Sequence, residues 1–239
     1  MGGALVTALL CAGYLGYVYS TTSGRTHPVK EAISSVRATL LGYELNGIDV
    51  SHHNGRIDWQ RVAQDKRIEF VYIKASEGAT YRDPLHKKNR AQARKAGIKV
   101  GAYHFYHEDV KPQLQFINFR AAVGSDWGDL IPVVDFEDIA GSADQIRQDL
   151  QTFCSLIEKS CGKKPMIYVG HSLHERFLRG YFDNYRIWAD WKWKLSHSSY
   201  PNLSVVQYGY WSREDMPESK HGVDYNTLAV PLEDILLHN

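Results

Sequence analysis

Short apolar runs recur along the chain from about residue 46 onward, and turn-forming or polar residues follow each of them. These runs are rich in Val, Ile and Tyr, which is the composition and length of β-strands. They cover residues 47–51, 70–76, 99–106, 131–137, 164–170, 185–191, 204–209 and 222–228. Several are apolar on both faces, as expected of parallel strands that are buried on both sides.

Amphipathic segments separate the first five runs and predict helices at 57–66, 83–97, 111–124 and 142–162. Pro84 lies near the start of the second helix and Gly97 after its end, and Ser142 could cap the last. The alternation of strands and helices predicts a parallel α/β sheet. A single irregular β/α barrel of the TIM type fits better than an open sheet, because no glycine-rich phosphate-binding turn follows the first strand. Beyond residue 170 the predicted helices shorten or vanish.

The N-terminal segment differs in character from the rest. Residues 2–20 carry no charge, so residues 1–20 are predicted to be a signal peptide or signal anchor, with a buried helix as the alternative. Residues 21–45 have the composition of a linker, and residues 46–239 form one predicted barrel domain. We therefore expect a monomer that works outside the cytoplasm, secreted, periplasmic or anchored to the cell envelope through this segment.

Charge and cysteine content exclude several classes. The 239 residues include 28 basic and 27 acidic side chains, so no basic excess is available to bind nucleic acid. The three cysteines, Cys11, Cys154 and Cys161, form neither a disulfide framework nor a Cys-x-x-Cys zinc motif. On one uninterrupted helix Cys154 and Cys161 would lie about 10 Å apart along the axis, too far to bond, so a disulfide would require the helix to end before Cys161, which the following Gly162 allows.

Polar residues gather at the carboxyl ends of the predicted strands, where β/α barrels form their active sites. The clearest case is Asp135 and Glu137, which lie two apart on one strand and point to the same face. Two close carboxylates disfavour double ionisation, so one is expected to keep its proton. Glu137 is predicted to be the general acid and Asp135 its ionised partner. Asp49 is expected to add to the negative electrostatic field at the site. A solvated carboxylate pair at a strand end is the alternative.

A metal site is the other reading of these carboxylates. His52, His53, His104 and His107 lie near the same strand ends and could complete a barrel metallohydrolase site. Adjacent histidines on an extended chain point in opposite directions, however, and no His-x-His occurs at a strand end. We therefore predict no metal and no other cofactor, and expect His104 to support a carboxylate by hydrogen bonding.

A series of short motifs makes the chain resemble the glycoside hydrolase family 25 lysozymes of the Chalaropsis and cellosyl type. In the family's order they are GIDVS (47–51), GRIDW (55–59), ASEG (75–78), GAYHF (101–105), DFE (135–137), QY (207–208) and GVDYN (222–226). The resemblance implies an irregular β/α barrel that cleaves the β-1,4 bond between N-acetylmuramic acid and N-acetylglucosamine. It also implies that Glu137 is the acid, that Asp135 is its partner, and that Asp49 and Asp224 line the same pocket.

Residues at the other strand ends are expected to bind the glycan strand of peptidoglycan. They are Glu77, Tyr103, Tyr106, Trp188, Gln207, Tyr208, Asp224 and Asn226. Among the aromatic ones, Tyr106 and Trp188 are the favoured sugar-stacking surfaces.

The sequence leaves the mechanism and two other functions open. A pair on one strand flanks a glycosidic bond poorly, which favours retention through attack by the substrate's own acetamido oxygen. The second choice is a mechanism that inverts the anomeric configuration, with Asp49 as the general base. A chitinase-like hydrolase of acetamido sugars and a catalytically silent glycan-binding module of the cell envelope are the alternative functions.

Overall fold

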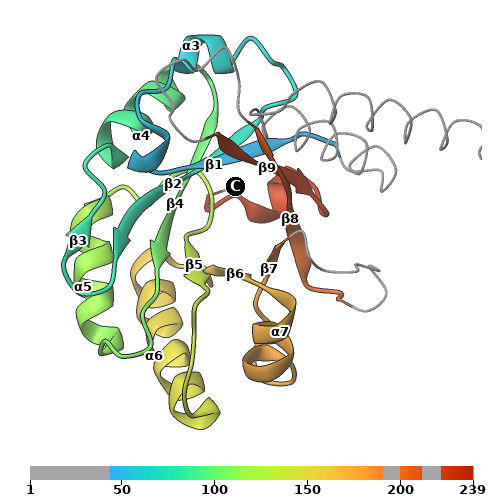
Figure 1. Cartoon of the computed structure of the whole chain (residues 1–239). Helices are drawn as coiled ribbons and strands as arrows, with labels where there is room; N and C mark the ends of the chain where they lie inside the picture. The colour runs from blue at the N-terminus through green and yellow to red at the C-terminus, as the bar shows by residue number, and fades with distance from the viewer. Residues whose placement is uncertain (1–43, 191–199, 212–221, 239) are drawn as a thin grey trace, which may run out of the picture.

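The computed structural model describes residues 44–190, 200–211 and 222–238. Within these ranges eight strands close a barrel in the order β1-β2-β4-β5-β6-β7-β8-β9, with β9 returning to β1 (Figure 1). The strands are β1 (Gly47–Val50), β2 (Phe70–Glu77), β4 (Lys99–Phe105), β5 (Val133–Phe136), β6 (Met166–Val169), β7 (Ile187–Asp190), β8 (Leu203–Trp211) and β9 (Val223–Leu228). The predicted barrel is confirmed, and each predicted strand overlaps an observed one.

The last strand corrects the expectation of a parallel sheet. Neighbours from β1 round to β8 are parallel, but β9 is antiparallel to both β8 and β1. A parallel neighbour needs a crossover of about a dozen residues or more, usually with a helix. The stretch between Trp211 and Val223 is shorter than such crossovers usually are. A two-residue strand, β3 (Tyr81–Arg82), which the sequence did not predict, pairs with the end of β2.

Helices cover the outside of the first half of the barrel (Figure 1). They are α3 (Trp59–Val62), α4 (His86–Lys95), α5 (Pro112–Val123) and α6 (Ala143–Cys161), followed by the short α7 (His171–Leu173) and η2 (His174–Leu178). Single turns, η1 (His52–Asn54) and η4 (Leu232–Ile235), follow β1 and β9.

Helix α6 bears on two predictions, the capping role of Ser142 and the pairing of the two cysteines. Ser142 occupies its N-cap position but makes no side-chain capping hydrogen bond. The helix continues through Cys161, and Gly162 ends it in a left-handed conformation with φ of 85°. Cys154 and Cys161 are both free, in agreement with their separation along the helix.

The barrel interior is filled by side chains below the level of the strand ends. Tyr72 on β2 is fully buried there and donates a hydrogen bond to the carbonyl of Ile131 at 3.2 Å. A Cβ atom at Gly101, its neighbour on β4, would collide with the Tyr72 ring, so only glycine leaves room for this tyrosine. Because these side chains fill the barrel only below the strand ends, space remains at its carboxyl end.

The predicted export segment, residues 1–20, and almost all of the predicted linker lie outside the described residues. Among the helices that the structure does describe, none is long and apolar enough to cross a membrane.

Candidate active site

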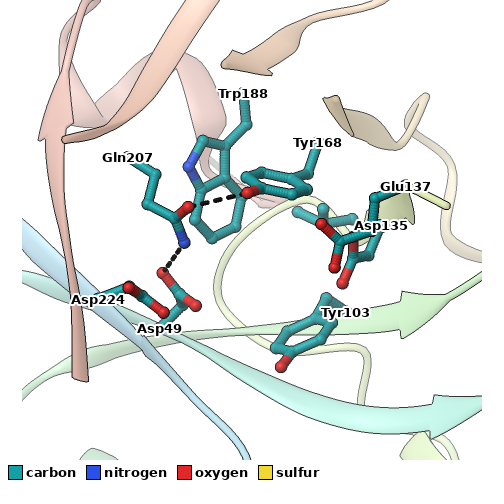
Figure 2. Close-up of a pocket in the computed structure, with 9 residues that line it drawn as sticks. Asp49, Tyr103, Asp135, Glu137, Tyr168, Trp188, Gln207 and Asp224 are labelled. Atoms are coloured by element: carbon teal, nitrogen blue, oxygen red, sulfur yellow. Dashed lines mark hydrogen bonds between the residues drawn. The ribbon is translucent and has the colours of Figure 1, made fainter. Parts of the chain in front are cut away.

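A cavity of about 270 Å³ opens at the carboxyl ends of the barrel strands (Figure 2). Side chains from seven of the eight barrel strands, or from the residues just after them, surround it. They are Asp49, Tyr103, Val133, Asp135, Glu137, Tyr168, Trp188, Gln207 and Asp224. The four acidic groups form two pairs on opposite sides of the cavity, Asp135 with Glu137 and Asp49 with Asp224 (Figure 2).

The strand β5 places the first pair by simple alternation. Val133, Asp135 and Glu137 face the cavity. Phe136 points the other way and packs on Phe177, with ring centroids 5.8 Å apart. Asp138 then takes a positive φ of 55°, a conformation that aspartate tolerates better than most residues. The chain therefore turns away immediately after Glu137 has been placed at the cavity.

Burial makes this pair difficult to ionise. It raises the pKa of Asp135 well above its ordinary value, and the Glu137 carboxylate adds to the effect. Burial also raises the pKa of Glu137, with a contribution from Asp138. Asp135 Oδ1 is buried without a hydrogen-bond partner in the described part of the chain, which also favours the neutral form. In the free pocket these factors favour at least one proton on the Asp135–Glu137 pair.

The second pair is built by the first and last strands. Asp49 and Asp224 are register partners, and Asp49 Oδ2 accepts hydrogen bonds from Asn226 Nδ2 at 2.8 Å and Gln207 Nε2 at 3.2 Å. Gln207 Oε1 in turn accepts a hydrogen bond from the Tyr168 hydroxyl at 2.8 Å. Burial raises the pKa of Asp49 to about 6 against the opposing effect of the two amides. Burial and the charge of Asp49 raise the pKa of Asp224 to about 8.

Comparison with known proteins identifies this arrangement. The family model described as "Glycosyl hydrolases family 25" matches residues 48–217, which is most of the chain. This chain belongs to glycosyl hydrolase family 25.

Relatives and solved structures agree with that family. The chain is 32% identical over 216 residues to the uncharacterized protein YegX of Escherichia coli K12, covering 87% of this chain and 77% of YegX. It is 39% identical over 83 residues to lysozyme M1 of Streptomyces globisporus, covering 35% of this chain and 28% of that protein. A family 25 glycosyl hydrolase from Bacillus anthracis has a similar structure, with a TM-score of 0.72, 27% identity, and coverage of 81% of this chain and 92% of its own.

The aromatic walls of this glycosyl hydrolase differ in part from those predicted. Tyr103 and Trp188 border the cavity, but Trp188 is only 3% exposed, because its ring lies against Tyr72 at 5.1 Å and Tyr168 at 5.3 Å. Little of the indole is therefore open for the stacking expected of it. Tyr168 also borders the cavity and was not predicted, although an aromatic residue near the carboxyl end of a predicted strand was a usable indication.

Four residues predicted to bind substrate are not among those that line the cavity. Tyr106 is 1% exposed and packs against core phenylalanines, so its expected role in stacking is wrong. Tyr208 lies where β8 shifts its register against β9, and its ring stacks on Tyr225 instead of lining the cavity. Glu77 instead pairs with Lys74 and His107. Asn226 is fully buried, and its side-chain amide donates a hydrogen bond to Asp49.

The histidines have structural partners. His104 lies between Ser76 Oγ at 2.8 Å and Gln115 Oε1 at 3.1 Å, so the expectation that it supports a carboxylate is wrong. Its burial lowers its pKa to about 3, which keeps the ring neutral. In the described ranges no three histidine, cysteine or carboxylate side chains form a group that could hold a metal ion.

Proposed function

We propose that this glycosyl hydrolase is a muramidase that cleaves the β-1,4 bond between N-acetylmuramic acid and N-acetylglucosamine in peptidoglycan. The observation that carries the proposal is the pocket with two carboxyl pairs facing each other at the mouth of a family 25 barrel. The similarity of part of the chain to lysozyme M1 of Streptomyces globisporus supports this substrate.

In the proposed reaction, Glu137 gives its proton to the oxygen of the bond that breaks. Burial raises its pKa, which suits an acid that must be protonated at working pH. In the free pocket Asp135 competes for that proton. An acetamido N–H of the bound sugar would donate a hydrogen bond to Asp135 and favour its ionised form. Substrate binding would thus leave the single proton of the pair on Glu137.

We propose substrate-assisted retention as the route. The acetamido oxygen attacks the anomeric carbon while the bond to the leaving oxygen breaks, and Asp135 stabilises the positive charge of the resulting oxazolinium ion. Water then attacks the same carbon from the opposite face, giving its proton to Glu137 and reopening the ring. Two inversions give net retention. The deep position of Asp135 beside Glu137 supports this division of roles.

A second route is supported by the position of Asp49. It lies across the cavity from Glu137, with a pKa near 6 and with two amides bound to one oxygen (Figure 2). A carboxylate in that position could instead remove a proton from an attacking water, which would give inversion.

Zymography on peptidoglycan tests the proposed function, with chitin as a second substrate. Wild type should clear peptidoglycan, and Glu137→Gln should not. Asp144→Asn is the matched control, since its carboxyl is 88% exposed on α6, away from the pocket. Clearing of chitin alone would indicate a chitinase-like enzyme, and binding of peptidoglycan without clearing by wild type would contradict the proposal.

Peptidoglycan lies outside the cytoplasm, so this function requires export. We propose that residues 1–20 serve as signal peptide or anchor, that residues 21–45 link this segment to the barrel, and that the enzyme acts as a monomer. Cell fractionation, with and without deletion of residues 2–20, tests the first point. Size-exclusion chromatography with light scattering tests the last.

A further inference from the structure

Lys74 is a charged residue inside the barrel wall that the proposed chemistry has not used. It lies on β2 two residues after Tyr72, whose side chain fills the barrel interior, so Lys74 points inward near the mouth. Its register partner on β4 is Tyr103, which borders the cavity. Lys74 is 7% exposed, and lysine is almost never buried to this extent unless it is paired.

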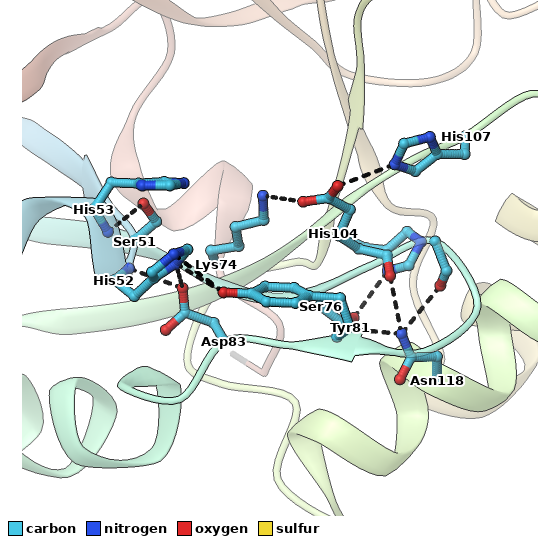
Figure 3. Close-up of polar contacts among 12 residues, drawn as sticks. Ser51, His52, His53, Lys74, Ser76, Tyr81, Asp83, His104, His107 and Asn118 are labelled. Carbon is cyan, nitrogen blue, oxygen red and sulfur yellow. Dashed lines mark hydrogen bonds and ion pairs between the residues drawn. The ribbon is translucent and has the colours of Figure 1, made fainter.

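A set of contacts fixes the Lys74 ammonium (Figure 3). Its Nζ donates a hydrogen bond to Glu77 Oε2 at 2.7 Å and lies 4.8 Å from the centre of the Phe105 ring. The other Glu77 oxygen is 3.1 Å from His107 Nε2. Tyr81 provides a second ring, 5.9 Å away. An ammonium held between aromatic rings and one carboxylate keeps a defined position.

The charges around the Asp135–Glu137 pair are mostly negative. The ionisable groups that face it from the surrounding elements are Asp49, Tyr103, Asp138, Tyr168, Asp190 and Asp224, with Lys74 as the opposing cation. The Phe105 ring that the ammonium contacts belongs to the register partner of Asp135, so Lys74 on β2 is separated from the pair on β5 only by β4. Burial and the acidic neighbours favour the neutral form of both members of the pair, whereas the charge of Lys74 lowers the pKa of each. Acid catalysis with an ionised partner needs one proton on the pair, not two.

We propose that Lys74 is a positioning residue for catalysis, whose buried ammonium, anchored by Glu77, keeps the Asp135–Glu137 pair in the singly protonated form. This inference rests on the proposed muramidase function. The role is electrostatic, because Lys74 itself does not line the cavity.

The pH dependence of peptidoglycan hydrolysis tests the role of Lys74. In Lys74→Met the side chain keeps its length and loses its charge, so the pKa values of both carboxyls rise. The acidic and the basic limbs of the pH–rate profile should both move to higher pH by on the order of one unit. At a fixed pH on the acidic limb, activity should fall about tenfold. Lys74→Arg, which keeps the charge, should restore the position of the limbs even if the maximal rate is lower.

Glu77→Gln provides the opposing variant. It removes the counter-ion and keeps the lysine, so the limbs should not move to higher pH. A loss of packing alone would lower the rates of both variants without separating their profiles. Profiles that coincide with wild type in Lys74→Met, or that move upward equally in Lys74→Met and Glu77→Gln, would overturn the inference.

A readout that needs no activity separates this inference from the proposed function. Carboxyl carbons of the full-length protein can be titrated by ¹³C NMR, with the Glu137 resonance assigned from Glu137→Gln. Lys74→Met should raise the apparent pKa values of the pair and Glu77→Gln should not. Absence of peptidoglycan hydrolysis in wild type would remove the proposed function, whereas unchanged carboxyl titration in Lys74→Met would remove the role of Lys74.

Discussion

Asp49 on β1 and Asp224 on β9 face each other as register partners across the antiparallel strand pair that closes the barrel. Both carboxyls border the cavity, and each makes ionisation of the other less favourable. With pKa values of about 6 and about 8, the two together hold roughly one proton at neutral pH.

Replacing Asp224 should change stability in a pH-dependent way. Folding raises its pKa from 3.8 to about 8, so its favourable contribution is complete below about pH 4 and is lost as the pH rises to about 8. Asp224→Asn should therefore raise the thermal midpoint over wild type by on the order of 10 °C at pH 8 and by little near pH 4. Differential scanning calorimetry at both pH values measures this. An equal difference at both would contradict the assignment of a raised pKa to Asp224.

Glu137→Gln should lose catalysis but keep the fold and the affinity for glycan. General acid catalysis contributes about 10²–10⁴-fold, and the amide cannot supply the proton. Release of reducing ends from peptidoglycan measures the rate, and co-sedimentation with insoluble peptidoglycan measures binding. Asp144→Asn should behave as wild type in both assays. A wild-type rate in Glu137→Gln would exclude Glu137 from the mechanism.

The first product should be the β-anomer if the acetamido oxygen is the nucleophile. Proton NMR of the new reducing end within minutes, before mutarotation, identifies it. Asp135→Asn should then be strongly impaired in the chemical step, because the amide cannot stabilise the oxazolinium charge. An α-anomer would instead indicate direct attack by water, and Asp49→Asn would become the critical variant.

The hydrogen-bonded chain from Tyr168 through Gln207 to Asp49 should matter for the position of Asp49. Gln207→Leu leaves Asp49 Oδ2 with the Asn226 amide and leaves the Tyr168 hydroxyl without its acceptor. Losing an amide donor should raise the pKa of Asp49 and lower the rate about tenfold. Tyr168→Phe keeps the Gln207–Asp49 bond and should cost less. A larger effect for Tyr168→Phe would point to direct contact between Tyr168 and substrate.

Chelation should leave hydrolysis unchanged, because the proposed steps use carboxyl groups and the substrate's own amide. Activity before and after dialysis against EDTA tests this, with readdition of zinc or magnesium. Loss of activity that a metal ion restores would contradict the proposed chemistry.

Alternation along strands explains why part of the site could be predicted. Asp135 and Glu137 could be assigned to one face from their spacing alone, and the structure places both at the cavity. The same rule could not place Tyr208, because the register of β8 against β9 shifts between Gln207 and Gly209, and only the stacking of Tyr208 on Tyr225 shows which way it faces. Tyr106 follows the end of β4, where alternation no longer indicates the direction of a side chain.

Other features depend on partners that are distant in sequence. The antiparallel β9 and the amide bond from Asn226 to Asp49 arise only when the barrel closes. The burial of Lys74 is equally hidden, because a single lysine in an apolar run is compatible with an exposed strand edge. Its ring neighbours and its counter-ion become apparent only in three dimensions.

Closure by β9 also restricts when the enzyme can become active during its own synthesis. Asp49 and the amide that supports it, Asn226, are separated by 177 positions, so a nascent chain carries the first carboxylate long before the ribosome reaches the last strand. Until β9 has left the exit tunnel, β1 lacks one neighbour and the second carboxyl pair does not exist. A nascent chain therefore carries the Asp135–Glu137 pair before it can assemble the pocket that holds both carboxyl pairs.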